Sequence, residues 1–99
     1  MDYKVVWTNS ARADLKQLVE YISEDNPAAA ESFGLAIIEK IESVGDFPRI
    51  GRIVPEENKE FLRELPYSPY RLIYEVHDDS RVVFIVRIWH SYRGSPEAD

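Results

Sequence analysis

The sequence contains no cysteine, only two histidines and no long apolar run, and each shortage excludes a class of protein. Without cysteine the chain forms no disulfide, no thiolate metal site and no cysteine nucleophile, which is compatible with a reducing compartment. No apolar run approaches the ~20 residues that cross a bilayer, and the first ten residues lack a basic segment followed by an apolar one. We therefore expect a cytoplasmic protein with no membrane partner. Because no spaced carboxylate motif accompanies the histidines, we expect neither a metal site nor a cofactor.

Positive charge is also scarce, since 12 Lys and Arg stand against 18 Asp and Glu, a formal net charge of -6. A protein that binds a phosphate backbone over a broad surface needs many Lys and Arg to neutralise phosphates, so this balance argues against such binding. The cations are unevenly distributed, because six of the seven after residue 50 are arginine. Arginine suits bidentate recognition of carboxylates or phosphates better than lysine does.

The stretch 61–93 carries the strongest structural signal. Residues 70–76 and 82–89 are dense in β-branched, aromatic and aliphatic side chains and are joined by a polar turn at 77–80, the pattern of a β-hairpin. Both runs have apolar side chains at odd and even positions, so we expect the hairpin at the centre of a sheet. Cations in such strands must be paired with carboxylates or face a cleft. The candidates for either role are Arg63, Arg71, Arg87, His90 and Arg93.

Two amphipathic helices are predicted before the hairpin. A short strand over residues 3–7 ends at Thr8-Asn9-Ser10, three good N-cap residues, and an apolar stripe at helical spacing follows. Pro27 suits the first position of a second helix, over about residues 27–45, with Asn26 as its cap. So short a connection predicts an antiparallel helical hairpin.

Three residues in the first part of the chain are candidates for contacts with a partner. Leu35 and Ile38 lie beside the apolar stripe of the second helix, where they either widen the core face or mark a docking surface. Residues 49–58 are predicted to form a long loop bracketed by prolines, and loops on a rigid scaffold often carry binding residues. Arg52 in this loop is either an anchor for backbone carbonyls or a partner contact.

Taken in order, these elements predict one domain over residues 1–99. Residues 61–65 are predicted as a further strand, and 66–69 as the turn that leads into the hairpin. A strand, two helices and then at least three consecutive antiparallel strands indicate an α+β domain. In this domain the N-terminal strand and the antiparallel helical hairpin are packed on one face of an antiparallel β-sheet. The other face is left for function.

Eight short motifs follow one another along the chain in the order of a known family. They are W-T-x-x-A-x-x-D-L over residues 7–15, Y-I over 21–22, N-P-A-A-A over 26–30, F-P-x-x-G-R over 47–52, V-P-E over 54–56, R-E-L over 63–65, Y-R-L-I-Y over 70–74 and R-I-W-H-S-Y-R over 87–93. Through them the chain resembles the RelE/ParE superfamily of toxins from bacterial type II toxin–antitoxin systems, and most closely the ParE, or plasmid-stabilisation, branch. The resemblance implies the RelE/ParE-like toxin fold.

The same resemblance implies growth inhibition, with two possible targets. ParE-like members inhibit DNA gyrase and are not known as nucleases, whereas RelE-like members cleave messenger RNA on the ribosome. Members of both branches are neutralised by a cognate antitoxin, which implies a toxin–antitoxin hetero-oligomer. A third possibility is a non-toxic member that only binds its antitoxin.

Three residues match positions that carry catalysis in the nuclease branch. Arg71 matches a phosphate-stabilising arginine, and His90 and Arg93 match the strand end where the nucleases place a histidine or arginine. A neutral imidazole is a competent base near neutral pH. Structural pairing is the alternative for each, for example Arg71 and Arg87 with Glu64 or Glu75.

Two departures weigh against an enzyme. The nucleases most like RelE have a tyrosine several residues beyond the final arginine, whereas residues 94–99 contain none and Tyr92 is displaced from that position. An acidic chain is also poorly suited to approach ribosomal RNA. The sequence therefore favours a toxin that binds a protein target, with DNA gyrase implied by the resemblance; if it is an enzyme, it is an mRNA endoribonuclease. The candidate contacts with target or antitoxin are Arg52, Arg63, Arg87, Tyr92, Leu35 and Ile38.

Overall fold

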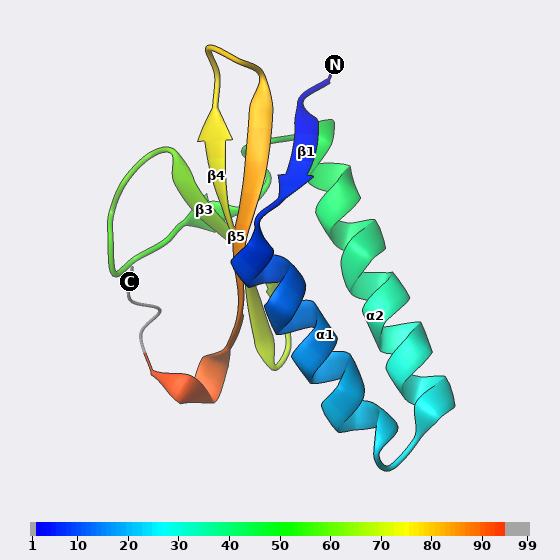
Figure 1. Ribbon diagram of the computed structural model, residues 1–99. Helices are drawn as coiled ribbons and strands as arrows, with labels where there is room; N and C mark the ends of the chain where they lie inside the picture. The colour runs from blue at the N-terminus through cyan, green and yellow to red at the C-terminus, as the bar shows by residue number, and fades with distance from the viewer. Residues whose placement is uncertain (1, 95–99) are drawn as a thin grey trace.

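A five-stranded sheet carries two antiparallel helices on one face in the computed structural model, which describes residues 2–94 (Figure 1). The strand order is β1-β5-β4-β3-β2, with β1 parallel to β5 and all other neighbours antiparallel. This confirms the predicted α+β class and the central position of the hairpin. The elements are β1 (Lys4–Trp7), α1 (Asn9–Ser23), α2 (Pro27–Glu42), β2 (Arg52–Ile53), β3 (Leu62–Tyr67), β4 (Tyr70–His77) and β5 (Val82–His90), with short 3-10 helices at Ser43–Gly45 and Ser91–Arg93.

Both helices begin at the residues that the sequence indicates. The Thr8 hydroxyl accepts a hydrogen bond from the Ala11 N–H at 3.2 Å, and the Asn26 side chain accepts one from the Ala29 N–H at 3.1 Å. Such caps each stabilise a helix by about 1 kcal/mol. None of the helices within residues 2–94 is both long and apolar enough to traverse a lipid bilayer.

The core lies between the helical hairpin and the sheet. Most of its largest fully buried side chains come from α2, β4 and β5, and the others are Val44 and Val54. The two helices approach closely at Gly34, where a Cβ atom would meet Val19 Cγ2 at 3.0 Å. The buried cluster consists of Ala11, Leu18, Ile37, Ile41, Val44, Leu65, Leu72, Tyr74, Val76, Val83, Ile85 and Ile88.

A one-residue bulge divides β5. Tyr74 of β4 lies opposite Ile85, whereas the preceding residue, Ile73, lies opposite Arg87, so Val86 has no partner in the β4 ladder. An extra residue of this kind moves every following side chain of its strand to the other face of the sheet. The bulge therefore decides which face each residue of the R-I-W-H segment occupies.

The outer edge of β5 is covered by a side chain where β1 has ended. β1 pairs only with Val82 to Ile85. Beyond that point Asp14 of α1 accepts the Ile88 backbone N–H at 2.9 Å and the Arg87 Nε–H at 2.8 Å. Because an exposed strand edge invites pairing with other chains, this carboxylate also protects the edge.

Two local predictions between the helices and the hairpin were wrong. The segment 49–58 is not all loop, because Arg52–Ile53 form β2 by pairing with Glu64 and Arg63 of β3. The predicted turn at 66–69 is shorter, because β3 continues to Tyr67. A proline is tolerated there because β2 does not extend beyond Glu64, so Pro66 lies in a part of β3 that is an edge.

Candidate functional site

The register between β4 and β5 places Arg71 and His90 on opposite faces of the sheet. Tyr70 lies opposite His90, and Arg71 lies opposite Trp89. Successive side chains of a strand alternate between faces. Tyr70 is on the helix side, because its ring centroid is 5.9 Å from that of Phe33 in α2 and 5.1 Å from that of His90. The structure therefore does not bring these two sequence-predicted residues together.

On the open face, Arg71 belongs to a group of four charged residues that we call the Arg71 cluster: Arg52, Glu56, Glu64 and Arg71. Arg71 Nε donates to Glu64 Oε1 at 2.6 Å, and Arg52 Nε donates to Glu64 Oε2 at 2.6 Å. The two terminal nitrogens of Arg71 donate to the two oxygens of Glu56 at 2.9 and 2.8 Å. Two cations thus meet two anions, and the formal charges cancel.

The cluster is built around a buried carboxylate. Glu64 is the one charged residue that is buried within residues 2–94, at 2% exposure. A buried charge persists only when it is paired and hydrogen-bonded, and both Glu64 oxygens meet that condition. Hydrogen bonds from Arg71 lower the pKa of Glu56, and the bonds to both carboxylates raise the pKa of Arg71. Both shifts favour the charged forms of Glu56 and Arg71.

A hollow of about 770 Å³ lies beside the Arg71 cluster on the open face. Its remaining lining includes Ser68, Ser91 and the segment around Gly51. Arg71 is only 14% exposed, whereas Arg52 is 66% exposed. Two guanidinium groups, paired with two carboxylates, line this hollow, and guanidinium groups are suited to bidentate recognition of an oxyanion.

His90 and Arg93 line a different groove, between α1 and the end of β5. This groove has a volume of about 460 Å³, and Tyr21 and Tyr92 on its lining are 73% and 88% exposed. His90 Nδ1 accepts the Tyr92 backbone N–H at 3.2 Å and so caps the last 3-10 helix. In the neutral ring, an accepting Nδ1 leaves the proton on Nε2. The lone pair that a base would use is therefore already engaged.

Arg87 and Arg93 both stack on Trp89. Their guanidinium carbons lie 5.0 and 5.1 Å from its ring centroid, and the indole N–H donates to the Gly94 carbonyl at 2.8 Å. Arg87 also forms an ion pair with Asp14. Arg93 forms no ion pair with another residue of the described chain. These contacts hold the end of β5 in place.

The remaining candidate contacts are dispersed over the surface. Arg63 donates to Glu60 at 2.9 Å and to the Gly51 carbonyl at 3.0 Å, so it anchors the loop. Leu35 is 59% exposed on α2. Ile38 lines a shallow hollow together with Trp7 of β1 and residues of α1. These residues therefore do not converge on one site.

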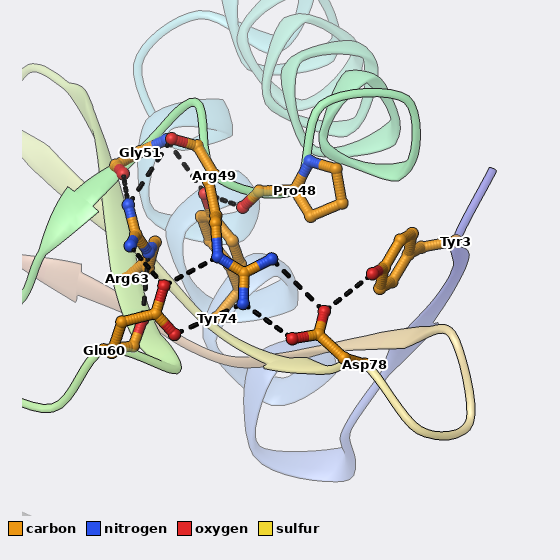
Figure 2. Close-up of polar contacts among 8 residues, drawn as sticks. All are labelled: Tyr3, Pro48, Arg49, Gly51, Glu60, Arg63, Tyr74 and Asp78. Atoms are coloured by element: carbon orange, nitrogen blue, oxygen red, sulfur yellow. Dashed lines mark hydrogen bonds and ion pairs between the residues drawn. The ribbon is translucent and has the colours of Figure 1, made fainter. Parts of the chain in front are cut away.

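Sequence reasoning missed a second arginine that bridges two carboxylates. Arg49 Nε donates to Glu60 Oε2 at 2.7 Å, and Arg49 Nη2 donates to Asp78 Oδ2 at 2.7 Å (Figure 2). Tyr3 Oη donates to Asp78 Oδ1 at 2.6 Å. These bonds lower the pKa of Asp78 to about 2. We call this group the Arg49 cluster: Tyr3, Arg49, Glu60 and Asp78. Arg49 occupies a variable position of F-P-x-x-G-R, so the motif gave no signal for it.

The backbone beside the Arg49 cluster is fixed by a buried tyrosine. Tyr74 Oη donates to the Pro48 carbonyl at 2.7 Å and accepts the Gly51 N–H at 2.9 Å (Figure 2). Burial raises the pKa of Tyr74. A Cβ atom at Gly51 would lie 2.5 Å from the Glu64 carbonyl oxygen, which explains why glycine occurs there.

Glu56 of the Arg71 cluster was also not predicted as a site residue, although the V-P-E motif contains it.

Two helices packed on a five-stranded, mostly antiparallel sheet match the fold of solved RelE and ParDE structures. Residues 5–93 match the family described as "ParE toxin of type II toxin-antitoxin system, parDE", and the chain belongs to this family. The recognition made from the motifs is therefore confirmed.

Relatives and solved structures carry both branch names. Toxin RelE2 of Caulobacter vibrioides is 37% identical over 91 residues, which cover 91% of this chain and 97% of the relative. The toxin–antitoxin complex RelBE2 from Mycobacterium tuberculosis matches with a TM-score of 0.66 at 26% identity, over 91% of this chain and 92% of that chain. The chromosomal ParDE system from P. aeruginosa matches with a TM-score of 0.73 at 22% identity, over 89% and 95%.

Proposed function

We propose that this protein is a ParE-like toxin that stops growth by binding and inhibiting a protein target in the cytoplasm. DNA gyrase is the target that the family resemblance implies. We further propose that a cognate antitoxin binds and neutralises this toxin in a hetero-oligomer. The toxin–antitoxin complex RelBE2, whose toxin has a similar fold, supports a partner of this kind.

The separation of Arg71 from His90 carries this proposal. RNA cleavage needs a base and a phosphate-stabilising cation within reach of the same phosphodiester. Arg71 faces the open side of the sheet and is bonded to two carboxylates, whereas His90 faces the helices and accepts a backbone N–H. Arg93 lines the groove of His90, but its guanidinium group is stacked on Trp89. The net charge of -6 also disfavours an RNA substrate. Binding to a protein requires neither convergence nor a basic surface.

The test is expression of the protein alone under tight induction, with growth, transcript integrity at ribosomes and plasmid supercoiling followed in the same cells. We expect arrest with intact transcripts and altered supercoiling. His90→Ala should remain toxic, because His90 has no catalytic role under this proposal. Arrest with cut transcripts and normal supercoiling, lost in His90→Ala, would reverse the assignment to the nuclease branch. Growth without arrest would support a non-toxic, antitoxin-binding member.

A further inference from the structure

We propose that the Arg71 cluster is a binding site for a carboxylate side chain of a protein partner, and that Glu56 occupies this site in the free toxin. The inference rests on the proposed function in one respect, namely that the partner is a protein. Beyond the proposed function, it names the binding site, identifies the ligand as a carboxylate, and assigns Glu56 as a group of the same chain that competes for the site.

The two carboxylates that hold Arg71 differ in how firmly they are placed. Glu64 belongs to β3, its side chain is 3% exposed, and it accepts hydrogen bonds from both Arg52 and Arg71. Glu56 belongs to the segment between β2 and β3, and its side chain is 31% exposed. Within the described residues it is ion-paired with Arg71, and the charge of Arg52 also attracts its carboxylate. Glu56 can therefore leave while Glu64 keeps its hydrogen bonds from Arg52 and Arg71.

The departure of Glu56 would expose a cationic fork. Arg71 Nη1, which now donates to Glu56, would be open to the hollow, and Nη2 would keep its contact with Glu64 Oε1 at 2.6 Å while losing its bond to Glu56. Arg52 lines the same hollow and uses Nε for Glu64. Two guanidinium groups would then face one remaining carboxylate, a formal charge of +1. An incoming anion would restore the balance.

The geometry favours a carboxylate as that anion. Arg71 already holds Glu56 through two parallel bonds of 2.9 and 2.8 Å, the fork arrangement in which guanidinium and carboxylate match. A single carboxylate replaces Glu56 group for group, without adding charge to a chain of net charge -6. A polyphosphate chain would bring many negative charges to an acidic surface. The partner we infer is therefore an acidic segment of a protein.

Glu56 acts in this scheme as a tethered competitor. Groups held in one chain compete at an effective concentration on the order of millimolar. A partner carboxylate must exceed that competition, so the free toxin binds isolated carboxylates weakly. Removing the charge of Glu56 while keeping its shape should raise the affinity about tenfold.

The chain offers a matched control for this change. Glu57 lies in the same segment, and its carboxylate lies 3.6 Å from Lys59 Nζ rather than on Arg71. Glu57→Gln and Glu56→Gln have the same net charge, so a general electrostatic effect would be equal in both variants. Only Glu56→Gln opens the Arg71 fork.

The experiment is titration of the purified toxin with the blocked peptide acetyl-Glu-Glu-Glu-amide, followed by amide chemical shifts in ¹⁵N-labelled protein. Sodium phosphate at the same ionic strength forms a second arm. We expect Glu56→Gln to bind the peptide about tenfold more tightly than both wild type and Glu57→Gln, with the shifts at residues around the hollow. In Glu56→Gln, a further Arg71→Lys change, which keeps a cation beside Glu64, should return the affinity to that of wild type.

Equal affinity of Glu56→Gln and Glu57→Gln would overturn the proposal, as would tight binding that survives Arg71→Lys. Phosphate binding as tight as peptide binding would refute the carboxylate assignment. The measurement uses neither cells nor gyrase. A failed titration would thus leave the toxicity experiment unaffected, and a failed toxicity experiment would leave the titration interpretable.

Discussion

Two arginines in this molecule each bridge two carboxylates, and they differ in what surrounds those carboxylates. Arg49 joins Glu60 and Asp78, whose side chains are 59% and 54% exposed. Arg71 joins Glu56 to Glu64, and the Glu64 side chain is 3% exposed. Water replaces a lost partner at an exposed carboxylate but not at a buried one. Ion pairs of similar length should therefore contribute very differently to stability, and four measurements test this.

The largest effect is expected for Arg71→Gln. The change leaves Glu64 buried with Arg52 as its one cation, so we expect a loss of about 3 kcal/mol in the free energy of unfolding, the lower end for breaking a buried pair. Urea denaturation followed by circular dichroism measures it. A loss below about 1 kcal/mol would mean that water reaches Glu64 and would remove the contrast between the clusters.

Arg49→Gln should be much milder. Its carboxylate partners are exposed and become hydrated, so we expect a much smaller loss in the free energy of unfolding than for Arg71→Gln, although both variants remove the same number of ion pairs. The same urea titration checks this. A loss equal to that of Arg71→Gln would show that the number of bonds, rather than burial, sets the contribution.

Acid should weaken both clusters within a defined range. Their arginines lower the pKa of Glu56 and Glu60 below the usual 4.5, and that of Asp78 to about 2. Because the lowered pKa belongs to the folded state, the stabilisation is complete above about pH 4.5 and is lost as the pH falls toward 2. Thermal unfolding at successive pH values should show this decline. Glu56→Gln should show a shallower one, and an unchanged slope would argue against the Arg71–Glu56 bond in solution.

The smallest effect is the response to salt. Exposed charges are screened over about 3 Å in 1 M salt, whereas buried pairs are screened much less. The stability difference between wild type and Arg49→Gln should shrink on addition of 1 M NaCl. The difference for Arg71→Gln should persist. If salt reduced both stability differences to the same extent, the two clusters would lie in the same dielectric environment.

Local signals allowed most of the fold to be predicted from the sequence. Thr8 and the Asn26-Pro27 pair mark helix starts through bonds within one turn, and the β4–β5 hairpin shows in an unbroken run of strand formers. β2 could not be predicted, because its two residues become a strand only by pairing with β3, about ten positions further along the chain. Pairing between distant segments leaves no trace in local periodicity.

The candidate site was predicted less completely, for a similar reason. Arg71 stood out because a cation in an apolar strand requires a partner, and Glu64, 7 positions earlier, was one of the partners considered. Glu56 was not predicted, because it lies 15 positions earlier in a loop. The bulge at Val86 is invisible in the sequence because Ile85, Val86 and Ile88 are all apolar, so no change in alternation marks it. The face that His90 occupies therefore could not be deduced.

Because of that bulge, strand register rather than residue identity decides whether Arg71 and His90 lie on the same face of the sheet. In a regular ladder counted from the turn, Ile88 would lie opposite Arg71, and His90 would share the face of Arg71. A chain with the same arginine and histidine at the same spacing, but with no bulge in β5, would thus bring the two groups to one side. Comparisons that match only the letters of the final motif cannot distinguish these arrangements. In this protein, NMR contacts between the Tyr70 and His90 rings would show that the bulge is present. The equivalent contacts would distinguish the two arrangements in other family members.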